Sequence, residues 1–301
     1  LPTNSTRKEV FEFIEKELKE IMPLLPSGVT YGRFTQNVAN TLLARLYLNA
    51  EVYTGSPRWQ DCLDACDKVQ GYQLTPNYKA SFAIQNEKSP EIIFAIPYDH
   101  KQGTVGNYLA SMTYHYNQKQ AFDPAGVYQW CGNGICAQPG LYSSFDAQDV
   151  RRNSLLIGQQ YSAKDGSEVL MDNGEPLNYT EEIADFTNAA QNAGARLNKY
   201  EWSATDQWER DNDWVLMRYA EILMMQAECN FRLGYIPTAL TYINQIRKRA
   251  GLTDLTSLTL DDIDTEWKHE FVFEGLRRTT NIRFGTYYNA WWEKPADPAD
   301  H

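Results

Sequence analysis

The chain has 301 residues, of which 43% are hydrophobic and 13% are aromatic, so a sizeable core is expected and disorder is not. Its formal net charge is −11, which argues against a nucleic-acid partner because phosphate backbones are bound by basic surfaces. No apolar run approaches the roughly 20 residues that cross a membrane as a helix.

The N-terminal segment predicts a helix over residues 3–21. Ser5 or Thr6 can cap its start, and Glu9 stands where the side chain of a capping box reaches back to the cap. Apolar residues recur at helical spacing and predict a buried stripe. Its members are Val10, Phe13, Ile14, Leu18 and Ile21.

Two further helices are predicted over residues 35–50 and 59–69. The pattern then changes, and residues 91–97, EIIFAIP, predict a short strand. Residues 98–205 are rich in Gly, Asn, Gln, Tyr and Asp and have few helical stripes, which predicts irregular loops with short hairpins. Short elements are predicted within them: a helix over 145–152 and a strand over 194–200.

The segment 213–251 predicts two helices joined by a tight turn. Apolar residues cover nearly the whole circumference of the first helix, which predicts that it is buried. Gly234 is expected to end it in the left-handed conformation, Pro237 suits the first turn of the second helix, and Gly251 closes that helix. The one polar stripe predicts ion pairs at helical spacing. These are Arg218 with Glu221 and Glu228 with Arg232.

A last helix is predicted after Thr259, with Asp262 three residues further on as its capping partner. Glu266, Glu270 and Glu274 recur along one face of this helix.

Four blocks in the second half of the chain, in this order, resemble the SusD/RagB family: RYAEILMMQAE, INQIRKRAGL, EWKHEFVFEGLRR and IRFG. The earlier block FTQNVANTLLARLYLNAEVYTG resembles a helical repeat of the same family. The resemblance implies a mainly α fold, with tetratricopeptide-like helical hairpins and irregular loop and short-strand insertions. It predicts one domain over 1–301, a helical scaffold over 3–72 and 206–290, and an insertion over 90–205 that carries the ligand surface.

Members of this family are surface glycan-binding lipoproteins of Bacteroidetes-type bacteria. The resemblance therefore implies that the protein captures a glycan and passes it to a TonB-dependent, SusC-like outer-membrane transporter. It implies no enzymatic activity and no cofactor. It places the protein on the outer membrane, held by an N-terminal lipid anchor that this chain does not include, and family members are longer, so the front portion is expected to be missing.

The stretch from Tyr108 to Tyr142 interleaves aromatic and amide side chains. Aromatic rings cover the C–H faces of sugars, and amides pair with their hydroxyl groups. Trp130 lies beside Gly132-Asn133-Gly134, where glycine allows a ligand close to the backbone. The candidate ligand residues are Trp130, Tyr128, Asn133, Tyr114, Tyr116 and Tyr108. The alternative for each tyrosine is that it packs the loops onto the helices.

No nucleotide-binding glycine loop, zinc-protease motif or serine-hydrolase motif occurs in the chain. Two alternatives to a glycan-binding protein stay open. One is a glycoside hydrolase whose carboxylate pair has no recognisable motif, and the other is a helical-repeat adaptor that binds peptides.

The five cysteines separate into two groups. Cys62, Cys66 and Cys229 lie on predicted helices and are expected to be small buried residues. Cys131 and Cys136 flank Gly-Asn-Gly-Ile in a loop, where both a disulfide and two free thiols are possible.

Overall fold

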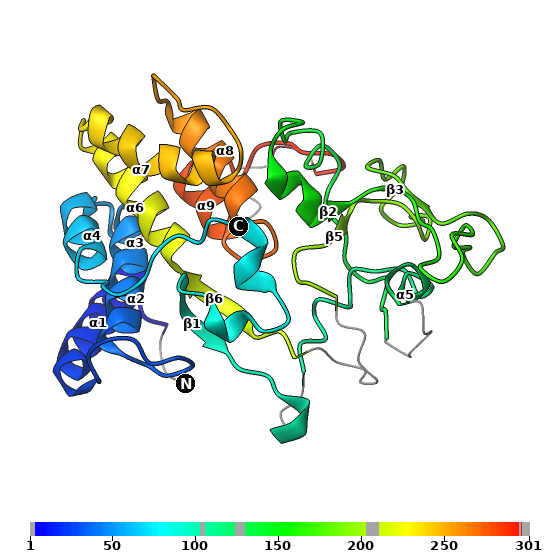
Figure 1. The fold of residues 1–301 in the computed structure, drawn as a ribbon. Helices are drawn as coiled ribbons and strands as arrows, with labels where there is room; N and C mark the ends of the chain where they lie inside the picture. The colour runs from blue at the N-terminus through cyan, green and yellow to red at the C-terminus, as the bar shows by residue number, and fades with distance from the viewer. Residues whose placement is uncertain (1–3, 103–105, 124–129, 203–210, 295, 297–301) are drawn as a thin grey trace. The chain divides into compact units, whose positions relative to one another are not determined.

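The structure is a computed structural model that describes residues 4–102, 106–123, 130–202, 211–294 and 296. The chain forms two compact units, shown in Figure 1. The first, the helical unit, comprises residues 1–76, 89–96 and 215–287. The second, the loop unit, comprises residues 77–88, 97–214 and 288–301. No helix in the described part of the chain is long and apolar enough to cross a membrane.

The helical unit contains the longer helices. Its helices are α1 (Arg7–Ile21), η1 (Met22–Leu24), α2 (Gln36–Leu48), α3 (Ala50–Thr54), α4 (Trp59–Cys66), α6 (Tyr219–Arg232), α7 (Ile236–Arg249), α8 (Leu260–Glu270) and α9 (Arg277–Arg283).

Local capping signals set where several of these helices begin. The Thr6 hydroxyl accepts a hydrogen bond from the backbone N–H of Glu9, and the Glu9 carboxylate accepts one from the backbone N–H of Thr6. The predicted capping box is therefore confirmed. Thr259 and Asp262 form the same box before α8. Pro237 lies in the first turn of α7, as predicted.

The predicted buried stripe of α1 is wrong in most of its members. Phe11 and Leu18 are the buried residues of this helix, and Leu18 alone was in the predicted stripe. Phe13 is 61% exposed. The helix contacts α2 and α3, and Phe11 and Leu18 are the residues of α1 that belong to the buried hydrophobic core. Val10, Ile14 and Ile21 are exposed.

Helix α6 is the central element of the helical unit. Every residue from Ala220 to Asn230 is buried, because α6 packs against both α4 and α7. The predicted burial of this segment is therefore confirmed. Gly234 follows the helix with φ +86° and Gly251 follows α7 with φ +81°, as the left-handed conformation after a helix requires.

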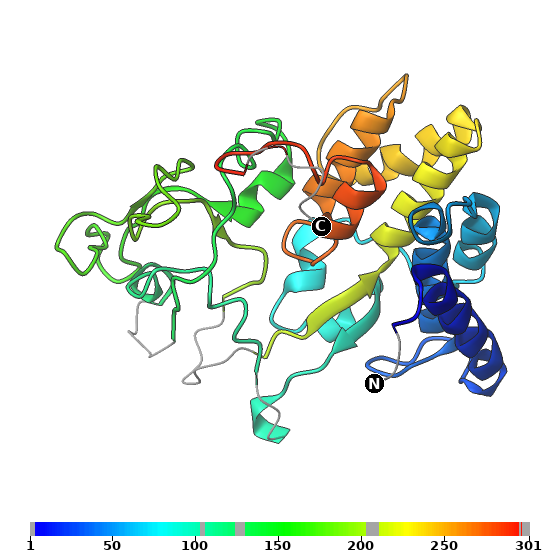
Figure 2. The same cartoon turned by 180° about the vertical axis from the view of Figure 1, so that it is seen from behind.

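The prediction that the α6 helix begins near Asp213 is wrong. Residues Trp214–Arg218 form strand β6, which pairs with β1 (Ile92–Ile96) and runs directly into α6 (Figure 2). Val215 and Met217 are buried, whereas Leu216 between them is 38% exposed. This alternation has the period of a strand. The apolar content of the segment suits a helix or a strand, and pairing with β1 selects the strand.

One of the two predicted ion pairs of this segment is confirmed. Arg232 Nε donates to Glu228 Oε1 over 2.9 Å. Arg218 is not paired with Glu221, because Arg218 lies in the strand and the two residues no longer share a helix face. Glu221 instead accepts hydrogen bonds of 2.5 and 2.6 Å from Arg45 of α2.

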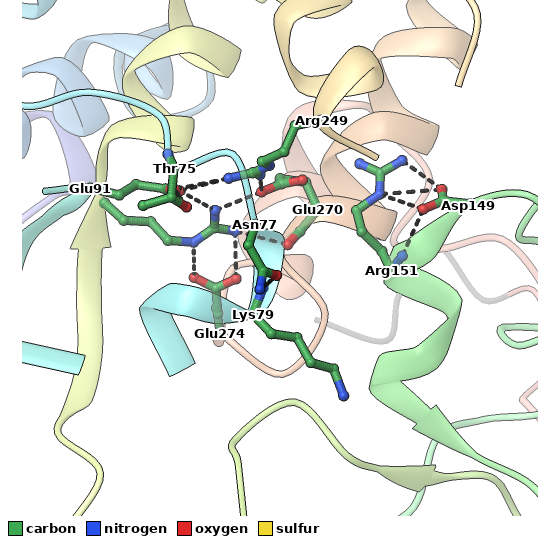
Figure 3. A network of polar contacts seen from close by, with 10 residues as sticks. Thr75, Asn77, Lys79, Glu91, Asp149, Arg151, Arg249, Glu270 and Glu274 are labelled. Atoms are coloured by element: carbon green, nitrogen blue, oxygen red, sulfur yellow. Dashed lines mark hydrogen bonds and ion pairs between the residues drawn. The ribbon is translucent and has the colours of Figure 1, made fainter. Parts of the chain in front are cut away.

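Arg218 is the centre of a buried cluster of charged side chains, the Arg218 cluster. Figure 3 labels its members Glu91, Arg249, Glu270 and Glu274. Its Nη1 donates to Glu91 over 2.8 Å and to Glu270 over 2.6 Å. Its Nε and Nη2 bind both oxygens of Glu274 over 2.7 and 2.8 Å. Arg249 binds Glu91 over 2.9 Å and also binds Glu270. All five side chains are at most 6% exposed.

The loop unit has little regular structure, as predicted. Two-residue strands pair as β2 with β5 and β3 with β4, both antiparallel. Its elements are η2 (Tyr78–Phe82), η3 (Asn86–Lys88), η4 (His100–Gln102), α5 (Lys119–Phe122), η5 (Val150–Ser154), β2 (Leu155–Leu156), β3 (Gly158–Gln159), β4 (Asn178–Tyr179) and β5 (Arg196–Leu197).

The short helix predicted over 145–152 is displaced. The structure has instead the 3-10 helix η5, which Asp149 starts by accepting a hydrogen bond from Arg151 N. The Asp149 side chain binds the backbone two residues further on. Such local side-chain hydrogen bonds compete with the backbone hydrogen bonds of an α-helix. The strand predicted over 194–200 is reduced to β5.

The boundaries of the two units differ in detail from the predicted scaffold and insertion. Residues 89–96 belong to the helical unit and residues 77–88 and 288–301 to the loop unit. The prediction of one domain over 1–301 stays a prediction.

The conformation of Gly234 supplies a stability test. Gly234→Val is expected to lower the free energy of unfolding by about 1 kcal/mol or more, because a β-branched residue is strained at positive φ. Gly234→Asn is the matched control and should lose less, since asparagine tolerates this region. Thermal melts check this, and a Val variant as stable as the wild type would contradict it.

The Arg218 cluster predicts an acid-dependent stability. Burial raises the pKa of Glu91, but Arg249 and Arg218 outweigh it and the net pKa lies below its usual 4.5. A carboxylate with a lowered pKa stabilises the fold above its unfolded value, and this contribution is lost as pH falls through the folded value. Glu91→Gln should destabilise the protein by about 3–5 kcal/mol near neutral pH, and this deficit should shrink as the pH falls below about 4.5.

Urea denaturation of wild type and Glu91→Gln across that pH range measures the deficit. Glu17→Gln, a substitution at an exposed position of α1, is the control and should match the wild type throughout. A Glu91→Gln deficit that does not change with pH would contradict the assigned linkage.

Candidate functional site

A pocket with a volume of about 710 Å³ lies entirely within the loop unit. We call it the aromatic pocket, because three exposed aromatic residues line it. Phe186 is 73% exposed, Trp291 42% and Trp292 37%. Its lining comprises residues 133–138, 189–191 and 291–294, with Ile183, Phe186, Ala193 and Arg196.

Backbone hydrogen bonds hold one wall of the pocket. Asn133 N donates to Tyr114 O over 2.8 Å, and Gly134 N donates to Met112 O over 2.7 Å. Ala137 N donates to Ala195 O over 2.8 Å. The wall is therefore an irregular segment bonded on both sides to its neighbours, which gives a loop a defined position without a strand.

Gln191 connects the polar residues of the pocket. Its backbone oxygen accepts from Asn133 Nδ2 over 3.1 Å and from Arg196 Nη2 over 2.6 Å. Its side-chain oxygen lies 2.9 Å from His115 Nε2, while His115 Nδ1 accepts from Asn117 N over 3.1 Å. The fully buried His115 ring therefore links Gln191 to Asn117 and serves as a structural residue.

The aromatic wall of the pocket comes from two segments far apart in the sequence. The rings of Phe186 and Trp292 meet edge to face, with centroids 5.8 Å apart. Phe186 N donates to Glu293 Oε1 over 3.3 Å, and Trp291 and Lys294 exchange backbone hydrogen bonds of 3.0 and 2.7 Å. Trp292 adopts φ +38°, an uncommon conformation for a bulky residue, of the kind found where surrounding structure holds a binding residue in place.

Of the five predicted residues that the structure describes, Asn133 alone lines the aromatic pocket. It adopts φ +47°, which asparagine tolerates. Its Oδ1 is buried and has no hydrogen-bond partner among the described residues. It therefore retains one unused acceptor beside the pocket.

The prediction for Tyr114 is wrong. Its side chain is 1% exposed, its ring packs edge to face against Phe122 and Trp202, and its hydroxyl donates to Asn198 Oδ1 over 2.8 Å. The ring therefore belongs to the interior of the loop unit and offers no face to a ligand.

Tyr108, Tyr116 and Trp130 lie outside the described lining of the pocket. Tyr108 and Tyr116 are 47% and 45% exposed, and Tyr108 contacts Trp130, with ring centroids 6.5 Å apart. Trp130 is half-buried, and its indole fills the space beside Gly132, where an added Cβ would lie 2.6 Å from the ring. The missing side chain of Gly132 therefore makes room for the Trp130 indole rather than for a ligand. Tyr128 lies outside the described residues.

Sequence reasoning missed Phe186, Arg196 and the Trp291-Trp292 pair. The adjacent tryptophans were the available signal, since two exposed indoles in a polar context are unusual. They lie beyond residues 90–205, the range in which the sequence predicts the ligand surface.

None of the five cysteines forms a disulfide in this structure, so Cys131 and Cys136 are not bonded to each other. Cys62, Cys66 and Cys229 are buried, as predicted. Burial raises the pKa of the Cys136 thiol, which lines the pocket, and nearby Arg196 offsets part of that increase.

Comparison with known proteins relates the chain to one family. Residues 90–300 match the model of the SusD family. Starch-binding protein SusD of Bacteroides thetaiotaomicron is 26% identical over an alignment of 343 residues, which covers 95% of this chain and 59% of that protein. The chain thus spans about three fifths of the length of this relative.

Solved structures show the same fold. Surface glycan-binding protein A from Bacteroides uniformis is 23% identical with a TM-score of 0.67, over 96% of this chain and 59% of that one. Surface glycan-binding protein A from Bacteroides thetaiotaomicron in complex with laminarihexaose is 22% identical with a TM-score of 0.67, over 94% of this chain and 62% of that one. The expected mainly helical, tetratricopeptide-like fold with insertions is therefore confirmed.

The packing of Gly194 against Cys136 predicts a cost of substitution at this wall. Gly194 adopts φ +83°, and an added Cβ would lie 2.5 Å from Cys136 Sγ. Gly140 has a similar φ of +85° with open space around it. Gly194→Ala is expected to destabilise the protein by about 1–3 kcal/mol more than Gly140→Ala, because only the first substitution adds a clash. Thermal melts of both variants measure the difference, and equal losses would contradict this packing.

Proposed function

Because this chain belongs to the SusD family, we propose that it is a glycan-binding protein and that its ligand occupies the aromatic pocket. The exposed rings of Phe186, Trp291 and Trp292 are the observation that carries the proposal. Flat aromatic faces cover the apolar faces of sugar rings, and a few polar groups beside them fix the orientation of the ligand.

The size and chemistry of the pocket support an oligosaccharide. A volume of about 710 Å³ falls within the range of small-molecule sites, about 300–1,000 Å³. Asn133 and Gln191 provide amide groups that serve as both donors and acceptors for hydroxyl groups.

The carboxylate content of the pocket favours binding over hydrolysis. Glu293 is the single carboxylate among the described residues that line it. Glycoside hydrolysis generally uses two carboxylates, one on each side of the scissile bond. We therefore propose a binding protein rather than a glycosidase.

The names of similar proteins support a role in glycan uptake. One is named as starch-binding, and another is a surface glycan-binding protein solved with laminarihexaose. On this basis we propose that the protein acts at the bacterial cell surface as an outer-membrane lipoprotein. It would pass its glycan to a TonB-dependent, SusC-like transporter.

Trp130 with Tyr108 and Tyr116 stays a second candidate contact surface. Tyr108 and Tyr116 expose nearly half of their area. An extended glycan could place one sugar unit in the aromatic pocket and bring other units into contact with this second surface.

Two alanine variants separate the two surfaces. A glycan array identifies an oligosaccharide that binds, and calorimetry then compares Trp291→Ala with Trp130→Ala. Loss of one stacking indole is expected to weaken binding by roughly 1–3 kcal/mol, the scale of burying such a ring. We expect this loss in Trp291→Ala, with little change in melting temperature because Trp291 is 42% exposed.

The outcomes are distinguishable. Loss of binding in Trp130→Ala alone would move the proposed site to the Trp130 surface. Absence of binding to every glycan on the array would overturn the proposed function.

A further inference from the structure

Arg196 is a buried cation in the wall of the aromatic pocket. It lies in β5 opposite Leu156, is 3% exposed, and lines the pocket. Its Nη2 donates to Gln191 O over 2.6 Å, and its guanidinium lies 4.9 Å from the centre of the Tyr179 ring. Its Nε is buried and has no partner among the described residues.

Arg196 differs from the other buried arginines of the described chain in lacking a carboxylate. Arg151, which is fully buried, binds Asp149 through Nε and Nη2 over 2.7–3.2 Å. Arg218 binds three glutamates. No carboxylate of the described residues lies within ion-pair distance of Arg196. A carbonyl and a ring face stabilise its charge without neutralising it.

An unpaired buried charge is costly, because burial removes the water that stabilises the ion. Burial lowers the pKa of Arg196, and the neighbouring Tyr179 and Cys136 offset this effect only in part. A guanidinium in this situation binds an oxyanion strongly, because its planar donors match the geometry of a carboxylate or sulfate group.

We propose that the aromatic pocket selects saccharides that carry an anionic group, a uronate carboxylate or a sulfate ester, and that this group pairs with Arg196. This inference rests on the proposed glycan-binding function. The rings of Trp291 and Trp292 cover the faces of the sugar units, while Arg196 provides the charge that a neutral sugar leaves unpaired.

The net charge of −11 does not oppose an anionic ligand at this position. Exposed charges further away than the Debye length, about 8 Å at physiological ionic strength, are largely screened. Within the pocket lining the described charged residues are Arg196, Lys294 and Glu293, so the local balance is positive.

Matched pairs of ligands test the proposal on the wild-type protein. Oligogalacturonides are compared by calorimetry with the same oligosaccharides after methyl esterification, which removes the charge and keeps the sugar. Sulfated galactan oligosaccharides are compared with their desulfated forms. A charge-assisted pair at Arg196 should make the anionic member of at least one pair bind about tenfold or more tightly, and the pair that responds identifies carboxylate or sulfate as the anion.

Substitution at Arg196 assigns the preference to this residue. Arg196→Gln should reduce the ratio of anionic to neutral affinity to nearly one, whereas Arg196→Lys should retain part of it because lysine keeps the charge without the fork of donors. Arg152→Gln is the matched control: Arg152 also stacks on a tyrosine, with its guanidinium 4.1 Å from the ring centre of Tyr142, but does not line the pocket. Its ratio should equal that of the wild type. The ratio is measured within each variant, so a partly unfolded fraction does not affect it.

Each other outcome overturns a specific statement. Equal affinity for the members of both pairs would overturn the anionic preference and leave glycan binding in place. A preference that persists in Arg196→Gln would place the anion at another residue. Failure of every oligosaccharide, charged or neutral, on the array and in calorimetry would overturn both this inference and the proposed function.

Discussion

The helical unit depends on the pairing of buried charge around Arg218. This residue is the last of β6 and precedes the first residue of α6, the helix on which the packing of α4 and α7 depends. Its guanidinium binds Glu91 beside β1, Glu270 of α8 and Glu274, while Arg249 of α7 binds the first two. Buried charges that lose a partner are strongly destabilising, so β1, β6, α7 and α8 are held in one arrangement.

The same constraint explains why the segment before α6 is extended. The backbone N–H of Tyr219 donates to Glu91 O over 2.8 Å, so the first residue of α6 is bonded to the residue that also binds Arg218. A helix that began earlier would turn Arg218 away from Glu91 and remove one of the two arginines that bind this carboxylate. Charge pairing and the β1–β6 hydrogen bonds therefore select the strand together.

The loop unit is stabilised differently. Its strands are two residues long, and its backbone groups are satisfied largely through irregular contacts such as those at Asn133 and Gln191. Loops held by specific hydrogen bonds can place side chains that a regular strand would direct elsewhere. This explains how the unit combines exposed aromatic rings with a buried, unneutralised guanidinium in one pocket, and why its proposed ligand presents both an apolar ring face and a negative charge.

Local sequence alone determined the ends of several helices and the identity of the family. The Thr6–Glu9 and Thr259–Asp262 boxes and the left-handed Gly234 depend on residues three or fewer positions apart, and short-range hydrogen bonding and sterics specify them without any tertiary contact. The tertiary structure decided the partners of Arg218, the burial of Tyr114 and the meeting of Phe186 with Trp292. These outcomes depend on residues separated by tens to more than a hundred positions, and hydrophobic periodicity carries no information about which distant segment a side chain will meet.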